Sequence, residues 1–191
     1  MRLFKVSGGV AQRSSLAEFR GANALAVDAS GSAVFAAGAD GIYRVDSESA
    51  TLLAPVANAG SLALAGGTLY AVDRAAKQVV ALDNLSASAS LRSVAGVEDP
   101  IAVGVSPDGT RLYVAEGESK VLDILNPGTS ELLSRIALDF APARVDSLGN
   151  SLFLLNARKE TTDTVQVLDA RQLAVYFIPA QDLGSVANLE D

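Results

Sequence analysis

An aromatic residue recurs at one position of a pattern that repeats about every forty residues. In each copy a turn glycine is followed four residues later by Phe or Tyr inside an apolar stretch. The aromatic positions are 35, 43 and 40 residues apart: Phe35, Tyr70, Tyr113 and Phe153. They account for four of the ten residues in the chain that are Phe (6) or Tyr (4), which random placement would rarely produce. The chain is therefore predicted to be a repeat array, with these aromatics at equivalent buried sites.

A second pattern has the same period. An apolar strand that closes on Asp, Asn or Ser occurs five times, with its last residues 39, 37, 43 and 43 positions apart: Ser7, Asp46, Asp83, Asn126 and Asp169. Two independent patterns with one period predict repeats at approximately 22–58, 59–97, 98–140 and 141–179, within a single domain that covers 1–191.

Each period contains apolar runs of strand length separated by turn residues. In the third copy the predicted strands are 101–105, 111–115, 120–125 and 131–138, and the breaks include Ser106-Pro107-Asp108-Gly109. No segment keeps a capped helical period over three turns. We therefore predict an all-β chain of four-stranded antiparallel units. Asp28, Asp108 and Asn150 are expected to shape the tight turns through side-chain to backbone hydrogen bonds.

Composition excludes several classes of function. Hydrophobic residues make up 49% of the 191 residues, which is enough for a core. The net charge of −7 disfavours nucleic acid as a partner. The chain has no Cys, His or Trp, and this removes the usual zinc sites, haem ligation by His or Cys, cysteine nucleophiles and Ser-His-Asp triads. Carboxylate, lysine, tyrosine and hydroxyl chemistry remain.

The third copy resembles a known family of repeats. Four-stranded units with a period of about 40–45 residues are typical of β-propeller blades. Residues 100–115, read as Pro-Ile-Ala-Val-Gly-Val-Ser-Pro-Asp-Gly-Thr-Arg-Leu-Tyr-Val-Ala, resemble the bacterial YVTN-type propeller repeat. The other copies match less closely and lack Ser-Pro-Asp-Gly. The resemblance implies a propeller-like array, and it favours an extracellular or periplasmic location, although the chain shows neither a signal-peptide pattern nor an apolar run of membrane-spanning length.

The two ends of the sequence read as partial blades. Residues 1–20 hold two strands, and the segment near Val186–Leu189 echoes a first strand. Three interpretations stay open: a fragment of a longer propeller, a small ring closed by both termini, or self-association of two copies that completes a larger ring. If the chain closes alone, Leu3–Val6 and Val186–Leu189 belong to one sheet.

Candidate site residues come from the blade loops. In an antiparallel unit the loop before the first strand and the loop between the second and third strands lie at the same end. Carboxylates in these loops are the predicted binding residues: Asp73, Glu98, Asp99, Glu116 and Asp139. Converging carboxylates can bind Ca²⁺ or Mg²⁺, but no Asp-x-Asp-x-Asp string appears, so no metal and no cofactor is predicted.

We interpret the chain as a non-catalytic binding or scaffold module that uses a loop face to bind a protein or a small polar ligand. The alternative is a hydrolase or lyase of sugar-like or lactone substrates that works through carboxylates such as Asp99 and Asp139, with or without Ca²⁺. The absence of His favours the module over the enzyme.

Overall fold

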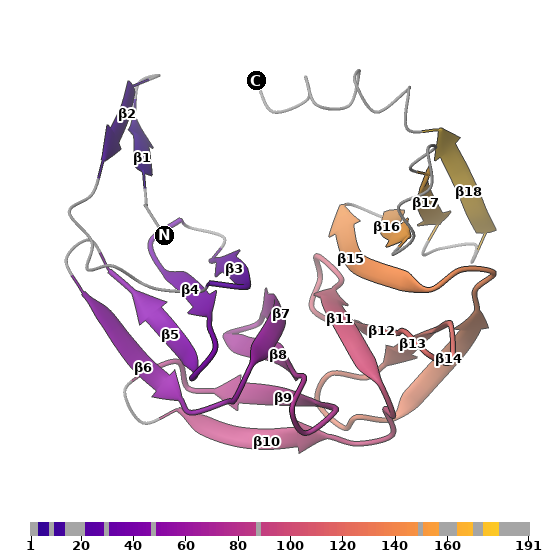
Figure 1. The fold of residues 1–191 in the computed structure, drawn as a ribbon, viewed down its shortest axis with the longest axis horizontal. Helices are drawn as coiled ribbons and strands as arrows, with labels where there is room; N and C mark the ends of the chain where they lie inside the picture. Colours follow the sequence, from indigo (N-terminus) through magenta and orange to yellow (C-terminus); the bar gives the residue numbers. More distant parts are fainter. Residues whose placement is uncertain are drawn as a thin grey trace. The chain divides into compact units, whose positions relative to one another are not determined.

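The computed structural model describes residues 22–28, 31–46, 49–86, 89–147 and 151–155 with their side chains. It also describes the backbone of 4–7, 10–13, 148, 156, 164–169 and 174–179. Every regular element in these ranges is a β-strand (Figure 1). No helix among the described residues is long and apolar enough to cross a bilayer. The predicted partial strand near Val186–Leu189 lies outside the described residues.

The strands form four sheets of four and one pair. The first sheet contains β3 (Ala24–Val27), β4 (Val34–Ala37), β5 (Ile42–Val45) and β6 (Ala50–Ala54). The second contains β7 (Ala59–Ala65), β8 (Thr68–Asp73), β9 (Gln78–Asp83) and β10 (Ser90–Val94). The third contains β11 (Pro100–Val105), β12 (Leu112–Glu116), β13 (Val121–Leu125) and β14 (Leu132–Ala137). The fourth contains β15 (Pro142–Leu148), β16 (Ser151–Asn156), β17 (Thr164–Asp169) and β18 (Ala174–Pro179). The pair is β1 (Phe4–Ser7) with β2 (Val10–Arg13).

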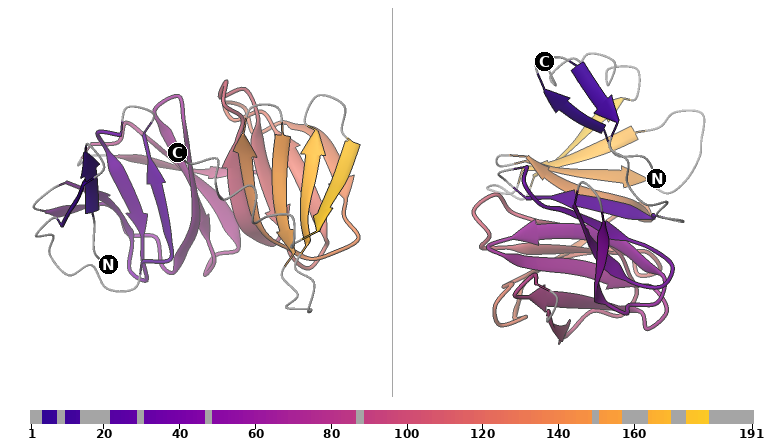
Figure 2. Two further views of the ribbon diagram at one scale, coloured as in Figure 1. Left: turned by 90° about the horizontal axis from the view of Figure 1, so that it is seen from above. Right: turned by 90° about the vertical axis from the view of Figure 1, so that its left-hand side faces the viewer.

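Each four-stranded sheet follows chain order, and every neighbouring pair is antiparallel (Figure 2). This is the up-and-down order of a propeller blade, because strands that are consecutive in the chain are neighbours in the sheet and no crossover is needed. The predicted all-β class and the four-stranded antiparallel units are confirmed. In the third sheet the predicted strand ends agree with the observed ones to within one residue.

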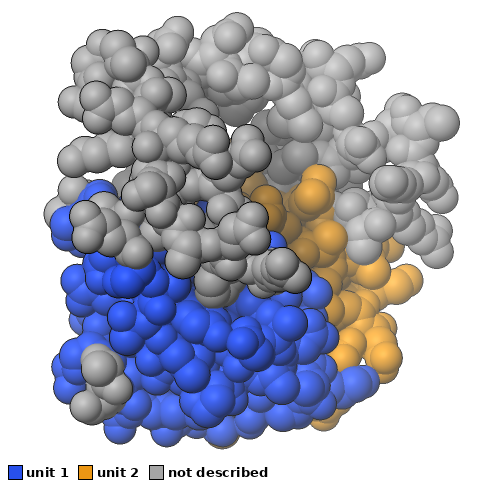
Figure 3. All heavy atoms as spheres, turned by 60° about the vertical axis from the view of Figure 1, so that its left-hand side comes forward, with its two compact units in different colours: residues 1–94 blue, residues 95–191 orange. Residues whose placement is uncertain are grey.

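The chain divides into two compact units, Met1–Val94 and Ala95–Asp191, which are coloured blue and orange in Figure 3. Unit 1 holds β1–β10 and unit 2 holds β11–β18.

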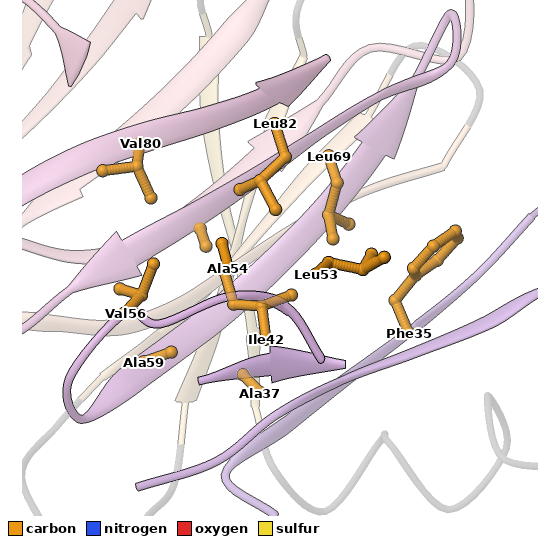
Figure 4. Close-up of a cluster of buried hydrophobic side chains, with 11 residues drawn as sticks. Phe35, Ala37, Ile42, Leu53, Ala54, Val56, Ala59, Leu69, Val80 and Leu82 are labelled. Carbon is orange, nitrogen blue, oxygen red and sulfur yellow. The ribbon is translucent and has the colours of Figure 1, made fainter. Parts of the chain in front are cut away.

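In unit 1 the first and second sheets pack face to face through apolar side chains (Figure 4). The side of a sheet that carries its repeat aromatic is called the aromatic face, and the other side the reverse face. The first sheet contributes its aromatic face, with Phe35, Ala37 and Ile42. The second sheet contributes its reverse face, from alternate positions of its strands: Leu62, Leu64, Leu69, Ala71, Val80 and Leu82.

Unit 2 repeats this arrangement with the third and fourth sheets. The aromatic face of the third sheet contributes Tyr113, Ala115, Leu122 and Ile124, and it packs on the reverse face of the fourth: Val145, Leu152 and Leu154. At Gly104 the inner strands approach closely, because an added Cβ would lie 3.3 Å from the carbonyl oxygen of Val145. The Ser147 hydroxyl also donates a hydrogen bond to the carbonyl of Val105.

The repeat aromatics occupy equivalent second-strand positions in β4, β8, β12 and β16. Phe35, Tyr70 and Tyr113 are buried as predicted, with 2%, 3% and 1% of their surface exposed. For Phe153 the prediction of a buried site is wrong, since this side chain is only half-buried. In β16 the neighbouring Leu152 and Leu154 face the third sheet. Phe153 therefore projects from the opposite side, where no described sheet of unit 2 packs.

The Ser-Pro-Asp-Gly turn between β11 and β12 is held by its own side chains. The Asp108 Oδ1 atom accepts hydrogen bonds from the Ser106 hydroxyl (2.5 Å), the Thr110 hydroxyl (2.8 Å) and the Thr110 N–H (3.0 Å). Gly109 has a φ of 70°, which a side chain rarely tolerates. In the first sheet Asp28 accepts from the Ala33 N–H at 2.8 Å. The turn roles predicted for Asp28 and Asp108 are confirmed, and Asn150 lies outside the described residues.

Two phenylalanines at the same repeat position provide a matched test of sheet packing. Phe35→Ala should lower the free energy of unfolding by about 3–4 kcal/mol, because it opens a cavity between two sheets. Phe153→Ala should cost about half as much or less, because its ring is already partly in water. Urea denaturation at low protein concentration measures both. Equal losses would contradict the difference in burial.

The Asp108 turn predicts a dependence of stability on pH. Hydrogen bonds from Ser106 and then Thr110 lower the Asp108 pKa from 3.8 to about 2. A lowered folded-state pKa means that the carboxylate stabilises the fold above about pH 4, and that this contribution disappears as the pH falls towards 2. Asp108→Asn should therefore lower the melting temperature at pH 6, and the difference from wild type should shrink between pH 4 and pH 2.5. A difference that is constant across this range would contradict the assignment.

Candidate functional site

Four of the five predicted binding residues gather at one end of the third sheet. The register joins Pro100 to Glu116, Glu116 to Val121 and Val121 to Ala137, so the start of β11 and the ends of β12 and β14 share that end. The residues at or just beyond these strand ends are Glu98, Asp99, Glu116 and Asp139. We call this group the acidic end.

Backbone hydrogen bonds hold the loops of the acidic end together. The Gly117 N–H donates to the Asp99 carbonyl at 3.2 Å, and the Leu138 N–H donates to the Lys120 carbonyl at 2.8 Å. Glu98 and Asp139 are exposed, Asp99 is half-buried, and Glu116 is buried. This end of the third sheet therefore carries exposed, half-buried and buried carboxylates.

The fifth predicted residue, Asp73, belongs to unit 1. It ends β8, and its Oδ1 atom accepts a hydrogen bond from the Ala76 N–H at 2.9 Å. Asp73 therefore shapes the β8–β9 turn of the second sheet and is not part of the acidic end.

An ion pair with a buried carboxylate lies beside the acidic end, between Asp123 on β13 and its cross-strand partner Arg135 on β14. The Arg135 Nε and Nη2 atoms donate to the two Asp123 carboxylate oxygens at 2.7 and 2.6 Å. The Asp123 side chain is completely buried, whereas that of Arg135 is 46% exposed. This bidentate geometry is the strongest form of carboxylate recognition by arginine, and it compensates the desolvated charge of Asp123.

Glu116 joins the same network. Its Oε1 atom accepts the Glu98 N–H at 3.1 Å and lies 3.9 Å from Arg135 Nη2, while its Oε2 atom accepts the Ser119 hydroxyl at 2.7 Å. The carboxylate thus ties the loop before β11 to the loop after β12. The hydrogen bond to Asp123, followed by the charges of Asp123, Glu116 and Glu98, raises the pKa of Arg135, and burial opposes this only in part.

Sequence reasoning did not single out Asp123, Arg135 or Ser119. The available signal was a charged residue inside the apolar run Val121–Leu125, because a buried carboxylate requires a partner. The second sheet also has an Asp–Arg pair, Asp83 with Arg92 at 3.0 Å, but both side chains are more than a third exposed. An exposed pair of that kind contributes little to stability.

The charges around the acidic end sum to a negative value. Six carboxylates (Glu98, Asp99, Glu116, Glu118, Asp123 and Asp139) and two cations (Lys120 and Arg135) leave 2 − 6 = −4. Among the residues with described side chains, no three or more Asp, Glu, His or Cys are arranged to hold a metal ion. Asp123 and Glu116 are buried, whereas Glu98, Glu118 and Asp139 are exposed and Asp99 is half-buried; we call these last four residues the rim.

The second sheet supplies a matched replacement for the ion pair. Counting from the aligned tyrosines Tyr70 and Tyr113, Val80 and Ser93 occupy the positions of Asp123 and Arg135. Arg135→Ser alone should lower the free energy of unfolding by about 2–3 kcal/mol, because it leaves the buried Asp123 charge without its partner. The value lies below the roughly 3–5 kcal/mol typical of fully buried pairs, because the guanidinium is partly in water.

The double variant Asp123→Val with Arg135→Ser should recover most of that loss, because it removes both charges and restores the pair found in the second sheet. Urea denaturation of the two single variants and the double variant measures the coupling. Losses that simply add would show that the pair does not act as a unit.

The comparisons with known proteins show the fold. No family model matches the chain, and no curated protein matches it. Among solved structures, hydrazine synthase from Kuenenia stuttgartiensis matches with a TM-score of 0.70 at 18% identity, over 92% of this chain and 53% of that chain. The structure of U3-55K matches with a TM-score of 0.70 at 16% identity, over 85% of this chain and 53% of that chain.

A chain of the mitotic checkpoint complex also matches with a TM-score of 0.70, at 15% identity, over 94% of this chain and 60% of that chain. All three neighbours are β-propeller proteins. The present chain spans between about half and three-fifths of their lengths. At these identities the likeness establishes the β-propeller type of fold, built here from four-stranded antiparallel blades.

Proposed function

We propose that this chain is a non-catalytic binding or scaffold module, and that the acidic end of its third sheet binds a cationic segment of a protein or a small polar cation. The observation that carries the proposal is that the carboxylates differ in their burial and in their contacts. The buried Asp123 and Glu116 hold the loops in place, whereas the rim residues Glu98, Asp99, Glu118 and Asp139 face the outside with a net negative charge.

The buried carboxylates are poorly suited to proton transfer. Asp123 is held by two short hydrogen bonds from Arg135, and Glu116 accepts from a backbone N–H and a hydroxyl. A general acid or base must reach a substrate proton with a carboxyl oxygen, and these oxygens are already engaged by groups of the protein itself. The pair therefore supports a structural role, and the rim supports recognition by charge.

The fold agrees with a binding role. Loops at the end of a rigid sheet can vary without disturbing the core, and recognition surfaces are commonly built on them. One structural neighbour was solved as a chain of a protein assembly, the mitotic checkpoint complex. We extend that kind of role to this chain as a proposal.

A fluorescent Lys/Arg-rich peptide tests the proposal by anisotropy titration. The triple variant Glu98→Gln, Asp99→Asn and Asp139→Asn should weaken binding at least tenfold, and binding to the wild type should fall steeply with salt concentration. The control removes three exposed carboxylates elsewhere, by Asp40→Asn, Asp46→Asn and Glu131→Gln. It carries the same change of net charge and should bind like the wild type.

Equal weakening in the rim variant and the control would show non-specific charge attraction and contradict the site. Turnover of lactone or glycoside substrates that is lost in Asp99→Asn or Asp139→Asn would contradict the non-catalytic assignment and establish the hydrolase alternative.

A further inference from the structure

The reverse face of the first sheet is apolar and remains partly exposed. One row across the sheet reads Leu25, Ala36, Tyr43 and Leu52, and the next reads Val27, Val34, Val45 and Ala50. The exposed fractions of Leu25, Val27 and Leu52 are 48%, 54% and 45%. Three of the seven large hydrophobic side chains that are exposed among the described residues therefore lie on this one face.

The same positions are covered in the second sheet. Its two rows begin with Leu62, Ala71 and Val80 and with Leu64, Leu69 and Leu82. All six pack against the aromatic face of the first sheet. Position for position, they correspond to Leu25, Ala36, Tyr43, Val27, Val34 and Val45. The reverse face of the first sheet therefore has the same apolar character as the reverse face of the second sheet, which is covered by a neighbouring sheet.

The complementary surface is the aromatic face of the fourth sheet. Phe153 is half-buried there, and Leu155 is 40% exposed. The equivalent residues of the third sheet, Tyr113 and Ala115, are buried against the next reverse face. The strand register continues the two rows with apolar residues: Val165 and Ile178 beside Leu155, and Val167 and Tyr176 beside Phe153.

The inner strand of the fourth sheet departs from this pattern. Arg144 and Asp146 take the positions held by Ala102 and Gly104 in the third sheet. Both are exposed, and they carry opposite charges.

We propose that two copies of this chain associate, with the aromatic face of the fourth sheet of one copy packed on the reverse face of the first sheet of the other. The two contacts of such a dimer would each pack an aromatic face on a reverse face. Each unit already contains one packing of this kind. The match covers 53% of the hydrazine synthase chain and 53% of the U3-55K chain, so each neighbour extends beyond the part that this chain matches. The surface is distinct from the acidic end, and the proposal does not rest on the proposed function.

Sedimentation equilibrium over a range of concentrations tests this self-association. The wild type should approach twice the chain mass of 19.6 kDa. Val27→Lys and Leu155→Glu should each weaken the dimer by at least tenfold, because each places a charge in the apolar contact. Leu133→Glu is the matched control: Leu133 is 50% exposed on the outer strand of the third sheet, and its variant should dimerise like the wild type.

Mixing the two charged variants separates this contact from other arrangements. In a mixed dimer one contact is wild type on both sides, and the other places the new lysine of the V27K copy against the new glutamate of the L155E copy. Mixing should therefore restore the dimer, whereas a contact of either face with itself would not be restored. Melting curves confirm that each variant is folded.

A wild type that stays monomeric at all concentrations would overturn the proposal and favour coverage by the chain's own terminal segments. Growth into higher polymers would overturn the two-copy form, because a head-to-tail contact that does not close produces filaments. A dimer that resists both face variants, or that is weakened equally by Leu133→Glu, would place the interface elsewhere.

Discussion

The fold depends on apolar packing between the faces of consecutive four-stranded sheets. A single antiparallel sheet of four- to seven-residue strands has little stability of its own, because each of its faces must be covered by another layer. Phe35 and Tyr113 provide large apolar side chains at the same place in their sheets, and both pack onto aliphatic side chains of the next reverse face. Each buried leucine of such a face contributes about 2 kcal/mol. The repeat in the sequence is the consequence, since every sheet must present two matching faces.

Among the described residues, Asp123 is a charged side chain inside this buried apolar packing. Asp123 and Arg135 take positions that the second sheet fills with Val80 and Ser93, so one repeat exchanges an ordinary pair for a buried ion pair. The exchange anchors Glu116, which joins two loops through the Glu98 N–H and the Ser119 hydroxyl. The loops at the acidic end are thereby held together, with exposed carboxylates on their outer side. That combination links the local departure from the repeat to the binding role proposed for the acidic end.

The sequence alone predicted the all-β class, the four-stranded units and the turns at Asp28 and Asp108, because these depend on local periodicity and turn chemistry. It also grouped Asp73, Glu98, Asp99, Glu116 and Asp139 on one loop face from strand direction; the last four lie at one end of the third sheet, whereas Asp73 belongs to the second sheet. It did not predict that Glu116 is buried or that Asp123 pairs with Arg135, since both depend on cross-strand register. It overestimated the burial of Phe153, because a repeat pattern predicts equivalent positions and not whether a neighbouring sheet covers them.

The most direct test of the account is a nuclear Overhauser measurement between sheet faces. Face-to-face packing predicts cross-peaks from the Phe35 ring to methyl groups of Leu69 or Leu82, and from the Tyr113 ring to methyl groups of Val145, Leu152 or Leu154. The equivalent Tyr70 ring should show no cross-peak to the methyl groups of the first sheet, because it projects from the other side of its own sheet. Cross-peaks from Tyr70 to the first sheet, or none from Phe35 and Tyr113 to the next sheets, would contradict the face-to-face order on which the structure rests.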